Sequence, residues 1–122
     1  MPTATAPSPP LNSREVARLL GIGIDTLHHL DDGGQIPGFR TPTGYRRYRP
    51  ADLERYLGEP DARGGWQPLL TTAQVARYLR VHPKSIRRWA RDGDLVEVRV
   101  GSVPRYRPAD LDAWLDPAKA VR

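Results

Sequence analysis

The chain has 122 residues and a formal net charge of +5 at pH 7. This length allows one ordinary domain or two very small ones, and the positive charge favours a polyanionic partner. The sequence contains no cysteine, which excludes a disulfide framework and a thiolate metal site. It also lacks an apolar run of about 18 residues and a signal-peptide pattern, so we expect a soluble, cytoplasmic, nucleoid-associated protein with no membrane partner.

Residues 1–10, MPTATAPSPP, are uncharged and rich in proline, which predicts a disordered N-terminal tail. The rest of the chain carries one pattern twice. At an offset of 59 residues LNSREVARLL matches LTTAQVARYL, and at an offset of 58 residues RYRPADLERYL matches RYRPADLDAWL. We interpret this as an internal duplication of one small unit. The first unit covers residues 11–57 and the second unit covers residues 70–116.

Between the two units, residues 58–69 are rich in glycine and proline and predict a linker. Residues 117–122 are expected to form a short C-terminal tail. A linker of about eleven residues spans at most roughly 36–40 Å when fully extended. That length allows the two units to lie one helical turn of DNA apart, which is about 34 Å.

Each unit has the signals of three helices and one hairpin. The first helix follows a capping-box pair, Asn12 with Glu15 and Thr71 with Gln74. A short loop leads to a second helix, and a glycine past its end can adopt the positive φ of a helix terminus. Two extended runs joined by a turn then predict a two-stranded wing, and a last helix begins at a proline. This order predicts a mostly α fold with small β wings, as two tandem winged helix-turn-helix domains.

The second helix of the second unit combines an apolar side with a basic side. Four basic residues fall at i, i+3, i+4 and i+7 and therefore share one helical face: Lys84, Arg87, Arg88 and Arg91. Helix-turn-helix proteins place base contacts near the start of this helix, where Ser85 lies. The wing adds Arg99, Arg105 and Arg107. We predict that the helix enters the major groove while the wing grips phosphate or a minor-groove edge. The alternative is a solvated basic face.

The segment TTAQVARYLRVHPKSIRRWARDGDL, followed by VEVRVGSVPRYRPADLDAWL, resembles the winged helix-turn-helix of the MerR superfamily. It is most similar to the small BldC-like and excisionase-like members. The segment RTPTGYRRYRPADLERYL of the first unit resembles the wing and third helix of the same group. The resemblance implies the fold and DNA binding. It does not distinguish a regulator from an excisionase, because both share the motif.

The first unit departs from this family in its second helix. Acidic residues and histidines stand where the second unit has its basic residues: Asp25, His28, His29 and Asp32. The wing of the first unit nevertheless keeps a dense set of arginines: Arg40, Arg46, Arg47 and Arg49. Three interpretations follow. The first unit binds DNA mainly through its wing, or its acidic helix forms a protein-contact face, or it is a degenerate copy that only stabilises the chain.

No catalytic constellation or cofactor motif is present. The glycines form no phosphate loop and the three histidines lack a triad setting, so we expect no enzymatic activity. His28 and Asp32 have the i, i+4 spacing of metal ligands, but two ligands make a poor site and none is predicted.

The sequence therefore predicts a protein that binds double-stranded DNA with some sequence preference, most simply a transcriptional regulator. Two units in head-to-tail order favour a direct repeat or an asymmetric site over a palindrome. One alternative is an excisionase-like factor that bends DNA for an integrase. Another is an adaptor that holds a protein partner through the acidic helix, and self-association along DNA is also open.

Overall fold

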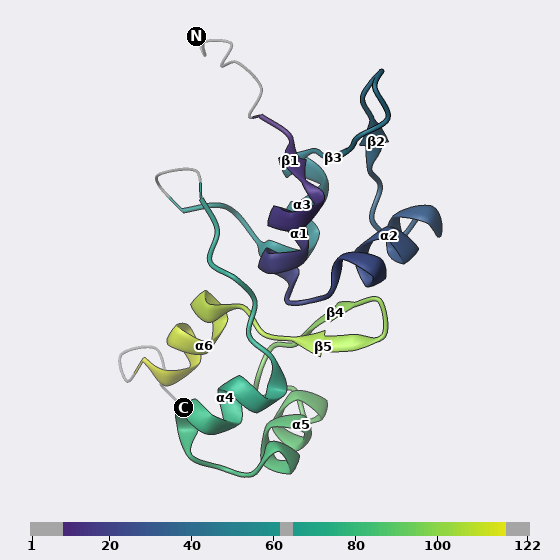
Figure 1. Ribbon diagram of the computed structural model, residues 1–122. Helices are drawn as coiled ribbons and strands as arrows, with labels where there is room; N and C mark the ends of the chain where they lie inside the picture. The colour runs from purple at the N-terminus through teal and green to yellow at the C-terminus, as the bar shows by residue number, and fades with distance from the viewer. Residues whose placement is uncertain (1–8, 62–64, 117–122) are drawn as a thin grey trace, which may run out of the picture.

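The computed structural model describes residues 9–61 and 65–116 (Figure 1). Apart from residues 9 and 10, the two predicted tails lie outside these residues. Within them the chain forms six helices and five short strands. In the first unit these are β1 (Leu11–Asn12), α1 (Ser13–Leu20), α2 (Ile24–Asp32), β2 (Phe39–Arg40), β3 (Arg46–Tyr48) and α3 (Pro50–Leu57). In the second they are α4 (Thr72–Leu79), α5 (Pro83–Arg91), β4 (Val98–Val100), β5 (Val103–Arg105) and α6 (Pro108–Leu115). The fold is mostly helical with small β elements, as predicted.

Both predicted capping boxes are formed. The backbone N–H of Glu15 donates to the Asn12 side chain over 2.8 Å, and the backbone N–H of Asn12 donates back to Glu15 over 3.2 Å. Thr71 and Gln74 exchange the equivalent bonds at 3.1 and 2.8 Å. Each box satisfies two backbone donors that a helix start leaves without partners, and so fixes where α1 and α4 begin.

The wing of the first unit has three strands, one more than predicted. Strand β3 lies between β1 and β2 and is antiparallel to both, with Leu11 opposite Tyr48. In the second unit β4 pairs with β5, and Leu70 forms a single bridge to Tyr106 at the position equivalent to β1. A strand of two residues is too short to show an alternating pattern, which is why the sequence did not predict β1.

The two units pack against each other. The buried core of the first unit includes Leu69, Val98 and Val100, which come from the linker end and the wing of the second unit. The backbone N–H of Leu69 donates to the carbonyl of Leu19 over 2.8 Å. The last residue of the predicted linker, residues 58–69, is therefore packed into the first unit. The two units are in contact, although the linker is long enough to let them lie apart. Figure 1 shows the hairpin of β4 and β5 lying between the first unit and α5.

Candidate nucleic-acid interface

Helix α5 is anchored by its apolar side and presents its basic side outward. It begins at Pro83, and the His82 ring accepts a hydrogen bond at Nδ1 from the backbone N–H of Lys84 over 3.0 Å. Ile86 is fully buried, and the Trp89 ring packs against the Trp114 ring with 5.5 Å between their centroids. These contacts leave four basic side chains exposed on the other side: Lys84, Arg87, Arg88 and Arg91. Ser85 is half-buried near the helix start.

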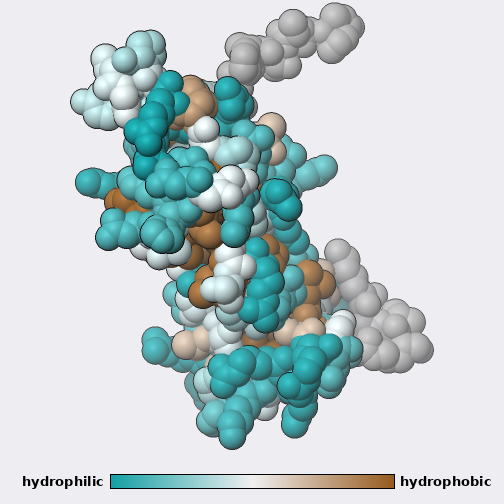
Figure 2. All heavy atoms as spheres, turned by 90° about the vertical axis from the view of Figure 1, so that its right-hand side faces the viewer, coloured by the Kyte–Doolittle hydropathy of each residue, from teal (hydrophilic) through white to brown (hydrophobic). Residues whose placement is uncertain are grey.

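The basic face of α5 is not neutralised by its own chain. Among the described residues, none of the four cations on this face forms an ion pair. Figure 2 shows hydrophilic residues gathered at the end of the molecule where α5 lies in Figure 1. Four unpaired cations on one exposed helical face form a surface that fits a phosphate backbone.

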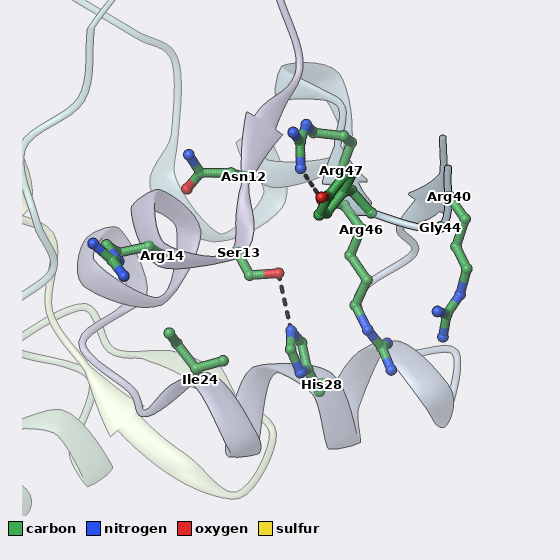
Figure 3. A pocket seen from close by; sticks show the side chains of 10 residues that line it. Asn12, Ser13, Arg14, Ile24, His28, Arg40, Gly44, Arg46 and Arg47 are labelled. Atoms are coloured by element: carbon green, nitrogen blue, oxygen red, sulfur yellow. Dashed lines mark hydrogen bonds between the residues drawn. The ribbon is translucent and has the colours of Figure 1, made fainter. Parts of the chain in front are cut away.

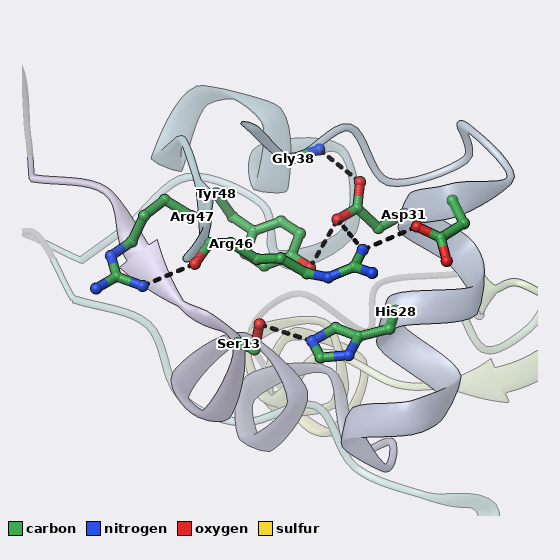
Figure 4. A network of polar contacts seen from close by, with 8 residues as sticks. Ser13, His28, Asp31, Gly38, Arg46, Arg47 and Tyr48 are labelled. Carbon is green, nitrogen blue, oxygen red and sulfur yellow. Dashed lines mark hydrogen bonds and ion pairs between the residues drawn. The ribbon is translucent and has the colours of Figure 1, made fainter. Parts of the chain in front are cut away.

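Helix α2, the equivalent element in the first unit, uses three of its six polar residues within the fold (Figure 4). The Asp31 carboxylate accepts from Arg46 Nη1 at 2.8 Å, from the Tyr48 hydroxyl at 3.1 Å and from the backbone N–H of Gly38 at 3.1 Å. Asp32 also accepts from Arg46 Nη1, at 2.9 Å. Two of the three acidic residues of α2 therefore share one arginine of their own wing.

The electrostatics of this cluster follow from these contacts. The hydrogen bond from Arg46 holds the pKa of Asp32 below its ordinary value, and the bonds to Asp32 and Asp31 raise the pKa of Arg46. Burial is the main reason that the pKa of Tyr48 is raised. These shifts favour the ionised carboxylate of Asp32, the cationic guanidinium of Arg46 and the neutral hydroxyl of Tyr48.

His28 is also engaged within the first unit. Its Nε2 lies 2.9 Å from the Ser13 hydroxyl at the start of α1, so the half-buried ring joins the two helices. Of the predicted protein-contact face, Asp25 and His29 remain as exposed side chains, and no hydrogen bond or ion pair joins either to the other described residues. No group of three or more potential metal ligands occurs among the described residues.

The wing of the first unit borders an open groove of about 590 Å³ with α1 and α2 (Figure 3). Arg14, Arg40, Arg46 and Arg47 line it. Arg47 donates from Nη1 to the carbonyl of Arg46 over 2.8 Å and lies over the Tyr45 ring. The Arg49 guanidinium stacks on the Phe39 ring at 4.4 Å from its centroid. Arg47 and Arg49 are thus held by aromatic rings and a carbonyl, and the side chains of Arg40 and Arg49 are exposed.

The three arginines predicted for the wing of the second unit make different kinds of contact. Arg99 is exposed and bonded to Glu97 at 2.9 Å and to the carbonyl of Ser102 at 3.0 Å. The guanidinium groups of Arg105 and Arg107 instead donate to backbone carbonyls of the first unit. Both guanidinium groups therefore lie at the junction between the units, and their predicted contact with DNA stays a prediction.

Comparison with known proteins gives matches in both halves of the chain. Residues 12–48 match the family described as "MerR family regulatory protein", and residues 69–118 match a "Helix-turn-helix domain" family. Among curated proteins, the HTH-type transcriptional activator TipA of Streptomyces coelicolor is 48% identical over 42 residues. The HTH-type transcriptional activator mta of Bacillus subtilis is 46% identical over 43 residues. Each match covers 34% of this chain and 17% of the relative. No solved structure gave a significant match.

Residues 12–48 carry a MerR-type helix-turn-helix, and residues 69–118 carry a helix-turn-helix domain. The first matched segment contains α1 and α2 with β2 and β3, and the second contains α4, α5 and α6 with β4 and β5. No helix in residues 9–61 and 65–116 is long and apolar enough to cross a membrane.

Sequence reasoning missed one residue of the MerR-type unit that organises its surroundings. Asp31 was not among the candidate residues, although it binds three partners. A signal for it exists in the alignment of the two units. Tyr48 and Tyr106 are equivalent and both fully buried, but Asp31 is replaced by Ala90 in the second unit. The Tyr106 hydroxyl accordingly has no hydrogen-bond partner among the described residues.

Proposed function

We propose that this protein binds double-stranded DNA and regulates transcription, with α5 as the main reading helix. The observation that carries the proposal is the exposed face of Lys84, Arg87, Arg88 and Arg91, none of which pairs with an acidic group in the described chain. Arginine donates two parallel hydrogen bonds to guanine or to phosphate, so this face suits both readout and positioning. Ser85 and Arg99 flank it and are proposed as further contacts.

The first unit is proposed to bind DNA mainly through its wing and the DNA backbone, with relaxed sequence reading. Arg40 and Arg49 are exposed, and Arg47 borders the groove beside α2. For Arg46 we propose a structural role, because it is bonded to Asp31 and Asp32. Since Arg46 offsets part of the charge of those two carboxylates, α2 is less repulsive to phosphate than its sequence suggests. Of its three acidic residues, only Asp25 lacks such a partner among the described residues.

The alternative proposals concern the same helix. One is that a protein partner binds at α2, and the other is that several molecules associate along DNA. In either case the contact would use Asp25 and His29, because the side chains of His28 and Asp32 are bonded within the first unit. Sedimentation of the protein with and without duplex separates these cases. A change in association state without DNA supports a protein contact, and one that needs DNA supports assembly on it.

The direct test compares two pairs of substitutions in a fluorescence anisotropy titration against a selected duplex. Arg87→Ala with Arg88→Ala should weaken binding by roughly 30-fold or more, since each well-placed base contact is worth about 1–3 kcal/mol. His28→Ala with His29→Ala should cost far less. Arg55→Ala with Arg77→Ala removes the same charge from two exposed positions outside the proposed surface and serves as the control. Equal losses in all three variants would refute a reading role for α5.

A further inference from the structure

Arg105 joins the wing of the second unit to the end of α1. Its Nε and Nη2 both donate to the carbonyl of Gly21, over 3.2 and 2.6 Å. Gly21 ends α1 in a left-handed conformation with φ of 69°, and a side chain on it would meet Arg105 Nε at 2.9 Å. A cation at a helix C-terminus is favoured by the exposed carbonyls there. Burial lowers the pKa of this guanidinium, in keeping with its place between the units.

Arg107 makes the same kind of contact with α3. Its Nε donates to the carbonyl of Tyr56 over 2.8 Å, and its Nη2 donates to the carbonyl of Arg55 over 3.0 Å. Both carbonyls belong to the last turn of α3, which ends at Leu57. A third nitrogen of the same guanidinium reaches Asp110 of α6 over 3.3 Å. One side chain therefore connects α3 of the first unit with α6 of the second.

Apolar contacts close the same junction. Val98 and Val100 are buried in the core of the first unit, and Val103 packs against it. At the hairpin turn, a side chain on Gly101 would approach Leu30 of α2 to 2.9 Å. The turn is therefore seated directly against α2.

The equivalent arginines of the first unit do not make such contacts. The alignment of the two units places Arg47 at the position of Arg105 and Arg49 at the position of Arg107. Arg47 bonds its own wing, and Arg49 is exposed over Phe39 with Asp52 at 3.9 Å. Arg105 and Arg107 thus bond to the other unit, whereas the contacts of Arg47 and Arg49 lie within their own unit.

We propose that Arg105 and Arg107 are positioning residues that hold the wing of the first unit and α5 at one separation and one orientation, and thereby set the spacing between the two parts of the DNA site that the protein accepts. Figure 1 shows α2, the turn between β4 and β5, and α5 on the same side of the molecule. The proposal rests on the proposed DNA binding. It adds that the target is read as one rigid two-part site, without Arg105 or Arg107 touching DNA.

The first test is a spacing series with the full chain. Duplexes carry the selected site with one, five or ten base pairs inserted between its two parts. One inserted base pair turns the parts by about a tenth of a helical turn, and ten move them about 34 Å apart on the same face. We expect every insertion to weaken binding by about tenfold or more. Recovery of affinity at ten base pairs, or indifference to all insertions, would overturn the proposal, because both indicate a flexible connection.

The variant Arg105→Ala with Arg107→Ala supplies a readout that loss of stability alone does not move. If it binds the original site, the penalty for one inserted base pair should fall to roughly threefold or less, which means relaxed spacing. An unchanged penalty in the variant would contradict a positioning role for the two arginines.

A second measurement needs no DNA. Because the chain has no cysteine, Ala51→Cys on α3 and Ala73→Cys on α4, both exposed, place two spin labels on separate units without side reactions. Electron–electron resonance should give one narrow distance distribution for this pair, and a broadened one after Arg105→Ala with Arg107→Ala. A broad distribution in the otherwise unchanged chain would overturn the proposal. Narrow distances in a protein that binds no duplex would sink the proposed function and leave the rigid junction standing.

Discussion

The acidic residues of α2 offer a sharp comparison, because two neighbouring aspartates bind the same arginine from different surroundings. The Asp31 side chain is 14% exposed, and it also accepts from the Tyr48 hydroxyl and the Gly38 backbone. The Asp32 side chain is 63% exposed and, among the described residues, accepts a side-chain hydrogen bond from Arg46 alone. Asp31→Ala and Asp32→Ala remove the same charge from adjacent positions of one helix. They should nevertheless differ strongly in stability.

The magnitude follows from the groups that lose a partner. Asp31→Ala leaves a half-buried backbone N–H and a buried tyrosine hydroxyl without their acceptor, and each such group costs about 1–3 kcal/mol. Since Arg46 keeps Asp32, we expect a total loss of about 2–4 kcal/mol. Asp32→Ala removes one ion pair that solvent screens, so its loss of stability should be clearly smaller than that of Asp31→Ala.

The assay is urea unfolding followed by far-ultraviolet circular dichroism. For a chain of this size, a loss of 2 kcal/mol lowers the melting temperature by about 10 °C, so a thermal scan gives an independent check. Asp31→Asn keeps the shape of the side chain and should fall between the two alanine variants. Equal destabilisation by Asp31→Ala and Asp32→Ala would show that Asp31 does not organise the first unit.

Two further predictions concern the same cluster. Tyr48→Phe should destabilise the protein by about 1–2 kcal/mol because it removes a hydrogen bond to a carboxylate. Tyr106→Phe should be neutral or stabilising because that hydroxyl has no partner in the described chain. Urea unfolding of the two variants checks this, and a larger loss of stability for Tyr106→Phe would contradict it. The folded-state pKa of Asp32 lies below its ordinary value of 3.8, so its ionised form stabilises the fold. That contribution is present above pH 3.8 and is lost as the pH falls through the lower folded-state pKa. The small stability difference between the unchanged chain and Asp32→Ala should therefore disappear in acid, and a difference that grows in acid would exclude the ion pair as its cause.

Much of the architecture could be predicted from the sequence because its signals are local. Capping boxes, prolines at the first helical position and the spacing of apolar residues depend on neighbours within one turn, and they gave the helices and their order. The basic face of α5 was predictable for the same reason, since Lys84 and Arg87 share a face whenever the segment is helical.

What the sequence could not predict depends on contacts between distant segments. Arg105 reads as a wing arginine until the hairpin is seen against Gly21, 84 positions earlier in the chain. Asp31 reads as one more acidic residue until β3 brings Arg46 and Tyr48 to it. Such roles are set by tertiary packing, and a count of charges along one helix does not contain them. The acidic character of α2 is thus explained in large part by bonds within the first unit.

The central claim is that this protein reads double-stranded DNA with α5, and selection of bound duplexes from a random pool by the full chain tests it most directly. The account predicts enrichment of one asymmetric or directly repeated sequence. If about six phosphates are contacted, log affinity for the selected duplex should fall with log salt at a slope of about −5. Arg87→Ala with Arg88→Ala should abolish the enrichment. A pool that stays random, with a salt slope near zero, would contradict DNA binding as the function of this surface.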